Sequence, residues 1–194
     1  MSISLVAGLG NPGREYEKTR HNLGFFVIEA FARKLGLAWK KQAQFEAETA
    51  RWDRAPGQTF VFAKPQTFMN ESGRSLRALS GFYKVDPASI FAIYDDLTID
   101  LGLVKVSVTG SAGGHNGVAS LLEHVGDGFN RYRLGIGPKQ PPQIDLKDFV
   151  LGKFSLEQQT IVDQKLDHYL SGLALLLEQG ADRAMNSLNR REIK

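Results

Sequence analysis

The chain has no cysteine among its 194 residues. Disulfide bonds, thiolate nucleophiles and metal sites built on cysteine are therefore excluded. The chain also lacks an unbroken run of about 18 apolar residues, the length that crosses a bilayer as a helix. No basic segment precedes the short apolar run at its start, as a secretory signal would require. We therefore expect a cytoplasmic protein that does not enter a membrane.

The charge balance shows only a small excess of one sign. The 24 lysines and arginines against 21 aspartates and glutamates give a net charge of +3. Such a charge is compatible with nucleic-acid binding and equally with an ordinary solvated surface. Hydrophobic residues make up 42% of the chain and charged residues 23%, as in a globular protein. The length predicts one domain over residues 1–194 with a sizeable core.

Predicted strands and helices alternate along the chain. The branched apolar run at residues 3–9 predicts a buried strand, and the helical spacing of apolar residues over 22–35 predicts a helix that stops at Gly36. Further strands are predicted over residues 45–52, 58–63, 90–94, 103–108 and 131–136, and further helices over 72–83, 116–125, 155–179 and 182–189. This alternation predicts a single α/β domain with a twisted, mostly parallel mixed sheet flanked by helices.

A GxGxxG pattern, Gly8, Gly10 and Gly13, follows the first predicted strand. In a dinucleotide-binding site the helix opens at these glycines, so that its N-terminus meets the pyrophosphate. Here Pro12 and the polar residues 14–20 come before the helical pattern, and no acidic residue follows at the required distance. We therefore expect the glycines to let the chain leave the strand tightly, and we expect no cofactor.

Polar residues gather where predicted strands end and predicted helices begin. They are Asn11, His21 with Asn22, residues 68–70, Asp95 with Asp96, and the segment 113–117. In an open α/β sheet, the loops at the carboxyl ends of the strands border one crevice. We therefore expect these side chains to meet in a single site.

A histidine beside a carboxylate is typical of a general base with an orienting partner, which His21 and Asp95 could form. The chain has no GxSxG motif and no cysteine, so water is the natural nucleophile. It has no HExxH motif, and its histidines lack zinc-ligand spacing, so we expect no metal. Structural roles stay open: His21 as a helix-start residue, Asn11 as a turn residue, Asn70 and Asn116 as helix caps, and Asp95 as a solvated strand end.

Several motifs together resemble those of the bacterial peptidyl-tRNA hydrolase family. They are VAGLGNPG at residues 6–13, Tyr16 with TRHN at 19–22, KPQTFMN at 64–70, YDDL at 94–97, GGHNG at 113–117 and RYRLGIG at 131–137. Their order and spacing match the family across nearly the whole chain. The resemblance implies a monomeric α/β esterase that cleaves the bond between a peptide and its tRNA, without metal or cofactor.

The resemblance also implies roles for individual residues. His21 is expected to activate water, Asp95 to orient His21, and Asn11 to stabilise the developing oxyanion. Asn70 and Asn116 are expected to hydrogen-bond the peptide and the attacking water.

Further residues of the resemblance concern the cleft and the tRNA. Tyr16, Met69 and His115 are expected to line the cleft that holds the terminal adenosine and the last residue of the peptide. Arg133 matches a basic residue that clamps a tRNA phosphate. Ser107 stands where the family commonly has a second basic residue, and we expect Lys105 to substitute, since it lies two residues earlier on the same face of a strand.

Two other functions remain compatible with the sequence. A non-catalytic RNA-binding domain would not require His21 to meet Asp95, although no RNA-recognition motif of the usual kinds is present. A relative diverted to another RNA-linked ester, or to intron splicing as in plants, would share the same motifs.

Overall fold

The computed structural model describes residues 2–190 of the chain. Within these residues a seven-stranded sheet has the order β2-β3-β4-β1-β5-β7-β6. The strands are β1 Ser2–Gly8, β2 Lys40–Gln42, β3 Ala47–Ala55, β4 Gln58–Pro65, β5 Ile90–Asp100, β6 Val104–Ser107 and β7 Asn130–Gly137. The central strands β4, β1, β5 and β7 are parallel, and β2, β3 and β6 add antiparallel pairs at the two edges.

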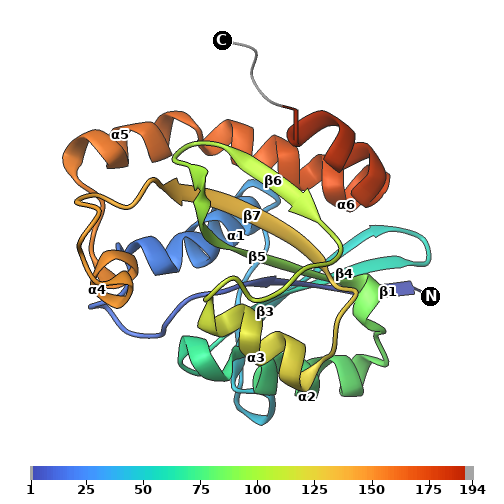
Figure 1. Ribbon diagram of the computed structural model, residues 1–194. Helices are drawn as coiled ribbons and strands as arrows, with labels where there is room; N and C mark the ends of the chain where they lie inside the picture. Colours follow the sequence, from blue (N-terminus) through green and yellow to red (C-terminus); the bar gives the residue numbers. More distant parts are fainter. Residues whose placement is uncertain (1, 191–194) are drawn as a thin grey trace.

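Helices cover both faces of this sheet, with α1 and α6 on one face and α2 and α3 on the other (Figure 1). The helices are α1 Leu23–Lys34, α2 Ser72–Tyr83, α3 Asn116–His124, α4 Leu146–Leu151, α5 Leu156–Gln164 and α6 Leu166–Leu188. The predicted α/β class with a mixed, centrally parallel sheet is therefore confirmed. Among the described residues, no helix is long and apolar enough to cross a bilayer.

The buried strand β1 supplies both halves of the core. Val6 packs with α1 and α6, whereas Leu5 and Ala7 pack with α2 and α3. This division follows from the two-residue repeat of a strand, which sends successive side chains to opposite faces. Because both faces are covered, β1 is apolar at every one of these positions, as the sequence pattern predicts.

The glycines of the GxGxxG pattern have a packing role. A Cβ on Gly8 would lie 2.6 Å from the carbonyl oxygen of Gly24, and one on Gly10 would lie 2.6 Å from the ring of Phe25. Only glycine therefore allows the start of α1 to lie so close to the end of β1. This contact brings the 3-10 turn η1 (Arg20–Asn22), which leads into α1, against β5.

Strand β5 is longer than predicted. The aspartates at residues 95 and 96 were expected to end it, but β5 continues to Asp100 with an irregular register between Asp96 and Asp100. The carboxylates do not end the strand because each has partners: Asp95 contacts two histidines and Asp96 contacts Arg133. Asp95 is thus a buried residue within the strand, and the alternative of a solvated strand end is wrong.

The C-terminal helices also differ from the prediction. The helix predicted over 155–179 is divided at Lys165, and the break predicted before residue 182 is a kink at Gly180, where φ is 82°. The predicted start is correct, since Ser155 and Gln158 form a capping box. Strand β2 and helix α4 were not predicted, because β2 is short and polar and α4 covers less than two helical turns.

Candidate active site

The loops at one end of the sheet enclose a cavity of about 960 Å³. This volume is in the usual range for ligand sites, roughly 300–1,000 Å³. Of the predicted site residues, those that line the cavity are Asn11, Tyr16, His21, Met69, Asn70, Asp95, His115, Asn116 and Arg133. Lys105 alone among the predicted set does not line it. The expected convergence of these loops on one crevice is therefore observed.

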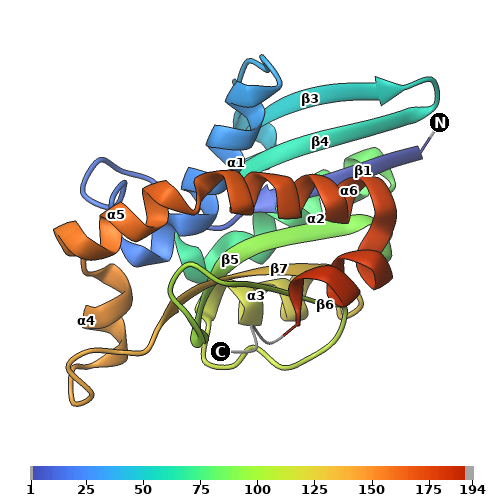
Figure 2. The ribbon, with the colours of Figure 1, turned by 90° about the horizontal axis from the view of Figure 1, so that it is seen from above.

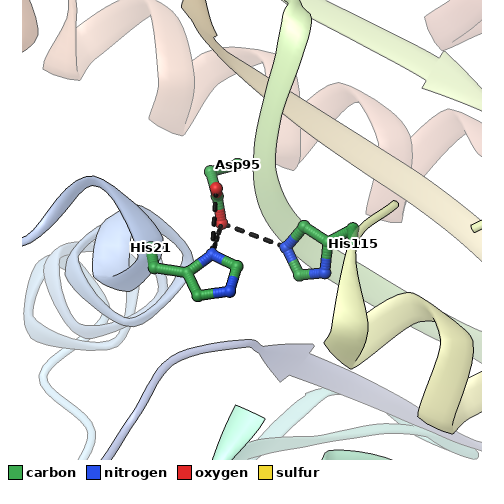
Figure 3. A group of neighbouring side chains, drawn as sticks. All are labelled: His21, Asp95 and His115. Atoms are coloured by element: carbon green, nitrogen blue, oxygen red, sulfur yellow. Dashed lines mark hydrogen bonds and ion pairs between the residues drawn. The ribbon is translucent and has the colours of Figure 1, made fainter. Parts of the chain in front are cut away.

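Three side chains that line this cavity come from separate elements and meet one another (Figure 3), and we call them the floor of the cavity. His21 comes from η1, Asp95 from β5, and His115 immediately precedes α3. Nδ1 of His21 lies 2.9 Å and 3.0 Å from the two carboxylate oxygens of Asp95, and Nε2 of His115 lies 3.1 Å from Oδ1 of Asp95. His21 and Asp95 are 6% and 2% exposed, so water screens their interaction little.

The hydrogen bonds assign the protons on both imidazole rings. His115 is the N-cap of α3, and its Nδ1 accepts a hydrogen bond from the backbone N–H of Val118 at 3.3 Å, so its proton is on Nε2 and is donated to Asp95. An ionised carboxylate only accepts, so His21 must donate from Nδ1. The lone pair of His21 is therefore on Nε2, which is directed away from Asp95 (Figure 3).

The carboxylate of Asp95 is ionised in spite of its burial. Burial by itself raises the pKa of an aspartate, because it disfavours the charged form. The hydrogen bonds from both rings, and the positive charge that His21 and His115 carry when they are protonated, outweigh burial and hold the pKa of Asp95 well below its ordinary value. Asp95 can thus stabilise an imidazolium that forms on His21.

Asn11 lies beside this cluster with its amide orientation fixed by the backbone. Its Oδ1 accepts a hydrogen bond from the backbone N–H of Met69 at 2.8 Å. Asn22 holds the backbone of Asn11 from the other side, accepting from its N–H and donating to its carbonyl oxygen, both at 2.9 Å. Because Oδ1 is occupied, the Nδ2 group of Asn11 is the part of the amide that remains available as a donor.

The structure decides between the capping alternatives. The residue preceding α3 that caps it is His115, and the N-cap position of α2 is occupied by Glu71, so neither Asn116 nor Asn70 is a helix cap. Both asparagines are exposed and line the cavity. His21 likewise caps no helix, since the N-cap positions of η1 and α1 belong to Thr19 and Asn22. Helix capping therefore does not account for Asn70, Asn116 or His21.

Two aromatic side chains also line the cavity, Tyr16 and Phe68. The rings of Tyr16 and Phe68 meet edge to face, with centroids 6.4 Å apart, and Phe68 is 55% exposed. Met69 is buried next to them, at 4% exposure. Such exposed aromatic surface in a cavity suits stacking against a base or an apolar side chain.

The predicted phosphate-binding residues lie on β7 and β6. The guanidinium of Arg133 is held by Asp96, with Nη2 2.9 Å from Oδ2. Lys105 stands directly opposite Arg133 in the antiparallel register and is exposed, but it lies outside the cavity lining. Ser107 does line the cavity and stands opposite Arg131, whose buried side chain binds the carbonyl oxygens of the loop before α3.

The floor cluster also has the composition of a possible metal site. His21, Asp95 and His115 offer ligand atoms that all lie within 4.8 Å of one another, a proximity that their sequence spacing did not suggest. Each of these nitrogens already donates a hydrogen bond, so a metal ion would have to displace both protons. The absence of a metal from the reaction therefore remains a prediction.

From the sequence, Asn22 and Phe68 were expected in the crevice, but neither was given a role. Asn22 holds the backbone of Asn11 in place. One wall of the site was missed because it had no signal in the sequence. This α4 wall consists of α4 and its N-cap residue, and it contributes Asp145, Leu146, Lys147, Val150 and Leu151 to the cavity lining.

The sequence matches the family model described as peptidyl-tRNA hydrolase over residues 5–194. A peptidyl-tRNA hydrolase of Gloeobacter violaceus is 38% identical over 192 residues, which cover 98% of this chain and 96% of the relative. A peptidyl-tRNA hydrolase of Synechocystis sp. is 41% identical over 194 residues, which cover 100% of this chain and 99% of the relative.

Solved structures agree with the sequence relatives. The crystal structure of peptidyl-tRNA hydrolase from Acinetobacter baumannii is 38% identical and superposes with a TM-score of 0.87, covering 96% of this chain and 94% of that chain. A peptidyl-tRNA hydrolase in complex with N-propanol has a TM-score of 0.88 at 37% identity, covering 99% of this chain and 97% of that chain. With the fold, the site and both kinds of relative in agreement, this chain belongs to the peptidyl-tRNA hydrolase family.

Proposed function

We propose that this chain hydrolyses the ester bond between the C-terminus of a peptide and tRNA, and that a water molecule activated by His21 is the nucleophile. The observation that carries the proposal is the fixed tautomer of His21, which donates Nδ1–H to Asp95 and keeps its lone pair on Nε2. A carboxylic ester of tRNA needs only such a base and a donor for the oxyanion.

In the proposed reaction, Nε2 of His21 removes a proton from water as the water oxygen attacks the ester carbonyl carbon. Asp95 stabilises the resulting imidazolium through its two hydrogen-bonded oxygens. The carbonyl oxygen becomes an oxyanion, and the Nδ2 group of Asn11 donates to it. Since Oδ1 of Asn11 is already bound to Met69, the donor needs no reorientation when the charge develops.

The tetrahedral intermediate then collapses and the bond to the ribose oxygen breaks. The imidazolium of His21 returns its proton to this leaving oxygen, which becomes the terminal hydroxyl of tRNA. The other product is the carboxylic acid of the peptide, which releases its remaining proton to solvent and becomes a carboxylate, and His21 regains its starting state. None of these proposed reaction steps requires a metal or a cofactor.

Neutral asparagines provide a basis for sparing ordinary aminoacyl-tRNA. A peptide carries an uncharged amide next to the ester, whereas aminoacyl-tRNA carries a cationic amine there. Asn70 and Asn116 are exposed in the cavity and can both donate to and accept from an amide. They cannot neutralise an ammonium group, so the free aminoacyl ester is expected to bind poorly.

The tRNA body is proposed to bind along β6 and β7. Arg133 and Lys105 stand side by side on these strands and would contact a phosphate together. Arg133 must exchange part of its contact with Asp96 for the phosphate, so we expect its contribution to be moderate. We expect the protein to act as a monomer in the cytoplasm, with peptidyl-tRNA as its partner.

The test is to incubate the protein with N-acetyl-aminoacyl-tRNA and with free aminoacyl-tRNA and to measure tRNA release from each. The proposal predicts fast release from the first substrate and release near the spontaneous rate from the second. Binding of both without hydrolysis of either would instead support a non-catalytic RNA-binding protein. Equal hydrolysis of both would contradict the proposed role of the asparagines.

A further inference from the structure

Arg20 is a buried cation that the reaction proposed above does not use. It immediately precedes His21 in η1, and its side chain is 9% exposed. No carboxylate forms a salt bridge with it among residues 2–190, and its Nε is buried without a hydrogen-bond partner. Burial lowers the pKa of Arg20, although an arginine side chain stays charged in a protein. A buried charge without a carboxylate partner is costly, so the hydrogen bonds and ring contacts of Arg20 must stabilise it.

The side-chain contacts of Arg20 lie on α4, on the start of α5 and on the segment between them. Its Nη1 donates to the carbonyl oxygen of Phe149 at 3.1 Å, and its Nη2 donates to Oε1 of Gln158 at 2.7 Å. The guanidinium also lies over the rings of Phe149 and Phe154, 4.3 Å and 5.4 Å from their centroids. Its backbone N–H donates to the carbonyl oxygen of Gly152 at 3.0 Å.

Helix α4 depends on these contacts. It has six residues, too few to be stable alone, and Phe149 is the one of them that is buried. Nη1 of Arg20 binds a carbonyl in its last turn, where a cation stabilises a helix. Of the described elements, η1 is the principal neighbour of α4, which otherwise stands apart at one end of the molecule (Figure 2).

The guanidinium of Arg20 is also closely packed against Gly152 and Gln158. A Cβ on Gly152 would lie 2.9 Å from Nη1 of Arg20 and 3.0 Å from the carbonyl oxygen of Asp148, so a side chain there would displace the guanidinium. Gln158 belongs to the capping box of α5, in which its Oε1 also accepts from the backbone N–H of Ser155. Arg20 therefore ties together the end of α4 and the start of α5, and through α4 it sets one wall of the cavity.

We infer that Arg20 is a positioning residue that fastens the α4 wall to the turn carrying His21, and so holds the cleft in the shape that binds the substrate. The role of the wall in binding rests on the proposed function, whereas the fastening itself does not. When the contacts of Arg20 are lost, we expect α4 to move away from η1. The fraction of molecules with a complete cleft would fall, and the KM would rise by the inverse of that fraction.

The test compares Arg20→Lys with Gln158→Met, a change on α5 away from His21 that removes the acceptor for Nη2. Gln158→Glu keeps the acceptor, and Arg74→Lys alters an exposed arginine that also bridges two partners, Glu46 and Glu71. Amide hydrogen exchange is measured without substrate, and kcat and KM are measured with N-acetyl-aminoacyl-tRNA.

For Arg20→Lys and Gln158→Met we expect exchange in α4 to accelerate by about tenfold, as for loss of a hydrogen bond to a charged group. Exchange in β1 and β5 should stay as in the wild type, and KM should rise by roughly 3- to 10-fold with a smaller change in kcat. Gln158→Glu and Arg74→Lys should behave as the wild type.

Unchanged exchange in α4 would overturn the inference. So would a loss of kcat at constant KM in Arg20→Lys alone, since Arg20 would then act on His21 directly. If Arg20→Lys does not fold, Gln158→Met still decides. If no variant and no wild-type protein hydrolyses the substrate, the proposed function fails while the exchange result stands by itself.

Discussion

Two regions of the cavity use polar side chains in opposite ways. The proposed catalytic residues are His21 and Asp95 of the floor together with Asn11 beside them, and we include Asn11 in the floor. All three are buried, and hydrogen bonds to other parts of the fold fix each side chain. The basic rim, formed by Arg133 of the cavity lining and by Lys105 outside it, is half-buried to exposed, and the ion pair of Arg133 with Asp96 is partly exposed to water. Burial makes orientation and electrostatics strong on the floor, and solvent makes them weak on the rim.

The difference separates two tasks. A group that stabilises charge during the reaction must already be oriented, which the floor achieves through Asp95, Met69 and Asn22. A group that attracts phosphate has mainly to be near and charged, which the rim achieves although Asp96 holds the guanidinium of Arg133. Changes on the floor are therefore expected to alter turnover, and changes on the rim are expected to alter binding and its dependence on salt.

Asp95→Asn should have the largest effect on turnover among the changes that leave the histidine in place. An amide replaces one of the two oxygens that accept from His21 by an NH2 group, and, being uncharged, it does not stabilise an imidazolium. We expect kcat to fall by about 100-fold or more while KM barely changes. Steady-state kinetics on N-acetyl-aminoacyl-tRNA measure both; a raised KM at constant kcat would mean that Asp95 acts on binding.

The oxygen and the NH2 group of the Asn11 side chain can be tested separately. Asn11→Asp keeps an oxygen for the N–H of Met69 but replaces the donor by a charged acceptor, whereas Asn11→Ala removes both. We expect both variants to lose about 10- to 1,000-fold in kcat, the usual cost of one oxyanion donor. Thermal unfolding should be closer to wild type for Asn11→Asp. Near-normal turnover in Asn11→Asp would exclude the donor role.

On the rim, Arg133→Ala should weaken binding of tRNA-linked substrates by about 10-fold and leave small ester mimics unaffected. The slope of log affinity against log salt should become shallower by about one unit, because one phosphate contact is lost. Lys105→Ala serves as the matched variant and should cost less, since Lys105 lies outside the cavity lining. Equal losses on both substrate types would make Arg133 a structural residue.

Removal of metal ions should have the smallest effect. The histidines that could bind a metal with Asp95 donate hydrogen bonds to it instead, so we expect EDTA to leave the rate of hydrolysis unchanged. The assay should keep the tRNA folded with a monovalent salt, so that chelation acts on the protein alone. If EDTA abolished the activity and zinc restored it, the floor would be a metal site, and this result would contradict the proposed mechanism.

The sequence predicted the floor well because each of its residues follows an apolar run at a strand end or begins a helix. The meeting of His21 and Asp95 followed from the rule that such loops share one edge of the sheet. Helix α2 has the bounds that were predicted, since its apolar spacing is regular. The rejection of the GxGxxG pattern as a nucleotide site also rested on local context alone.

Other features depended on contacts that no local pattern carries. The continuation of β5 past Asp95 requires the histidines and Arg133 to be in place as partners. Helix α4 is stabilised by Arg20 across 129 residues of sequence, so its own six residues gave no signal. The tautomer of His115 likewise depends on the backbone N–H of Val118 at the start of α3.

The central claim is that His21 is the base that activates water, and His21→Ala tests it most directly. The single-turnover rate on N-acetyl-aminoacyl-tRNA should fall by about 100-fold or more. Thermal unfolding and tRNA affinity, measured on the same preparation, should stay near wild type, because His21 faces the cavity and caps no helix. A folded His21→Ala protein that hydrolyses this substrate at the wild-type rate would contradict the account.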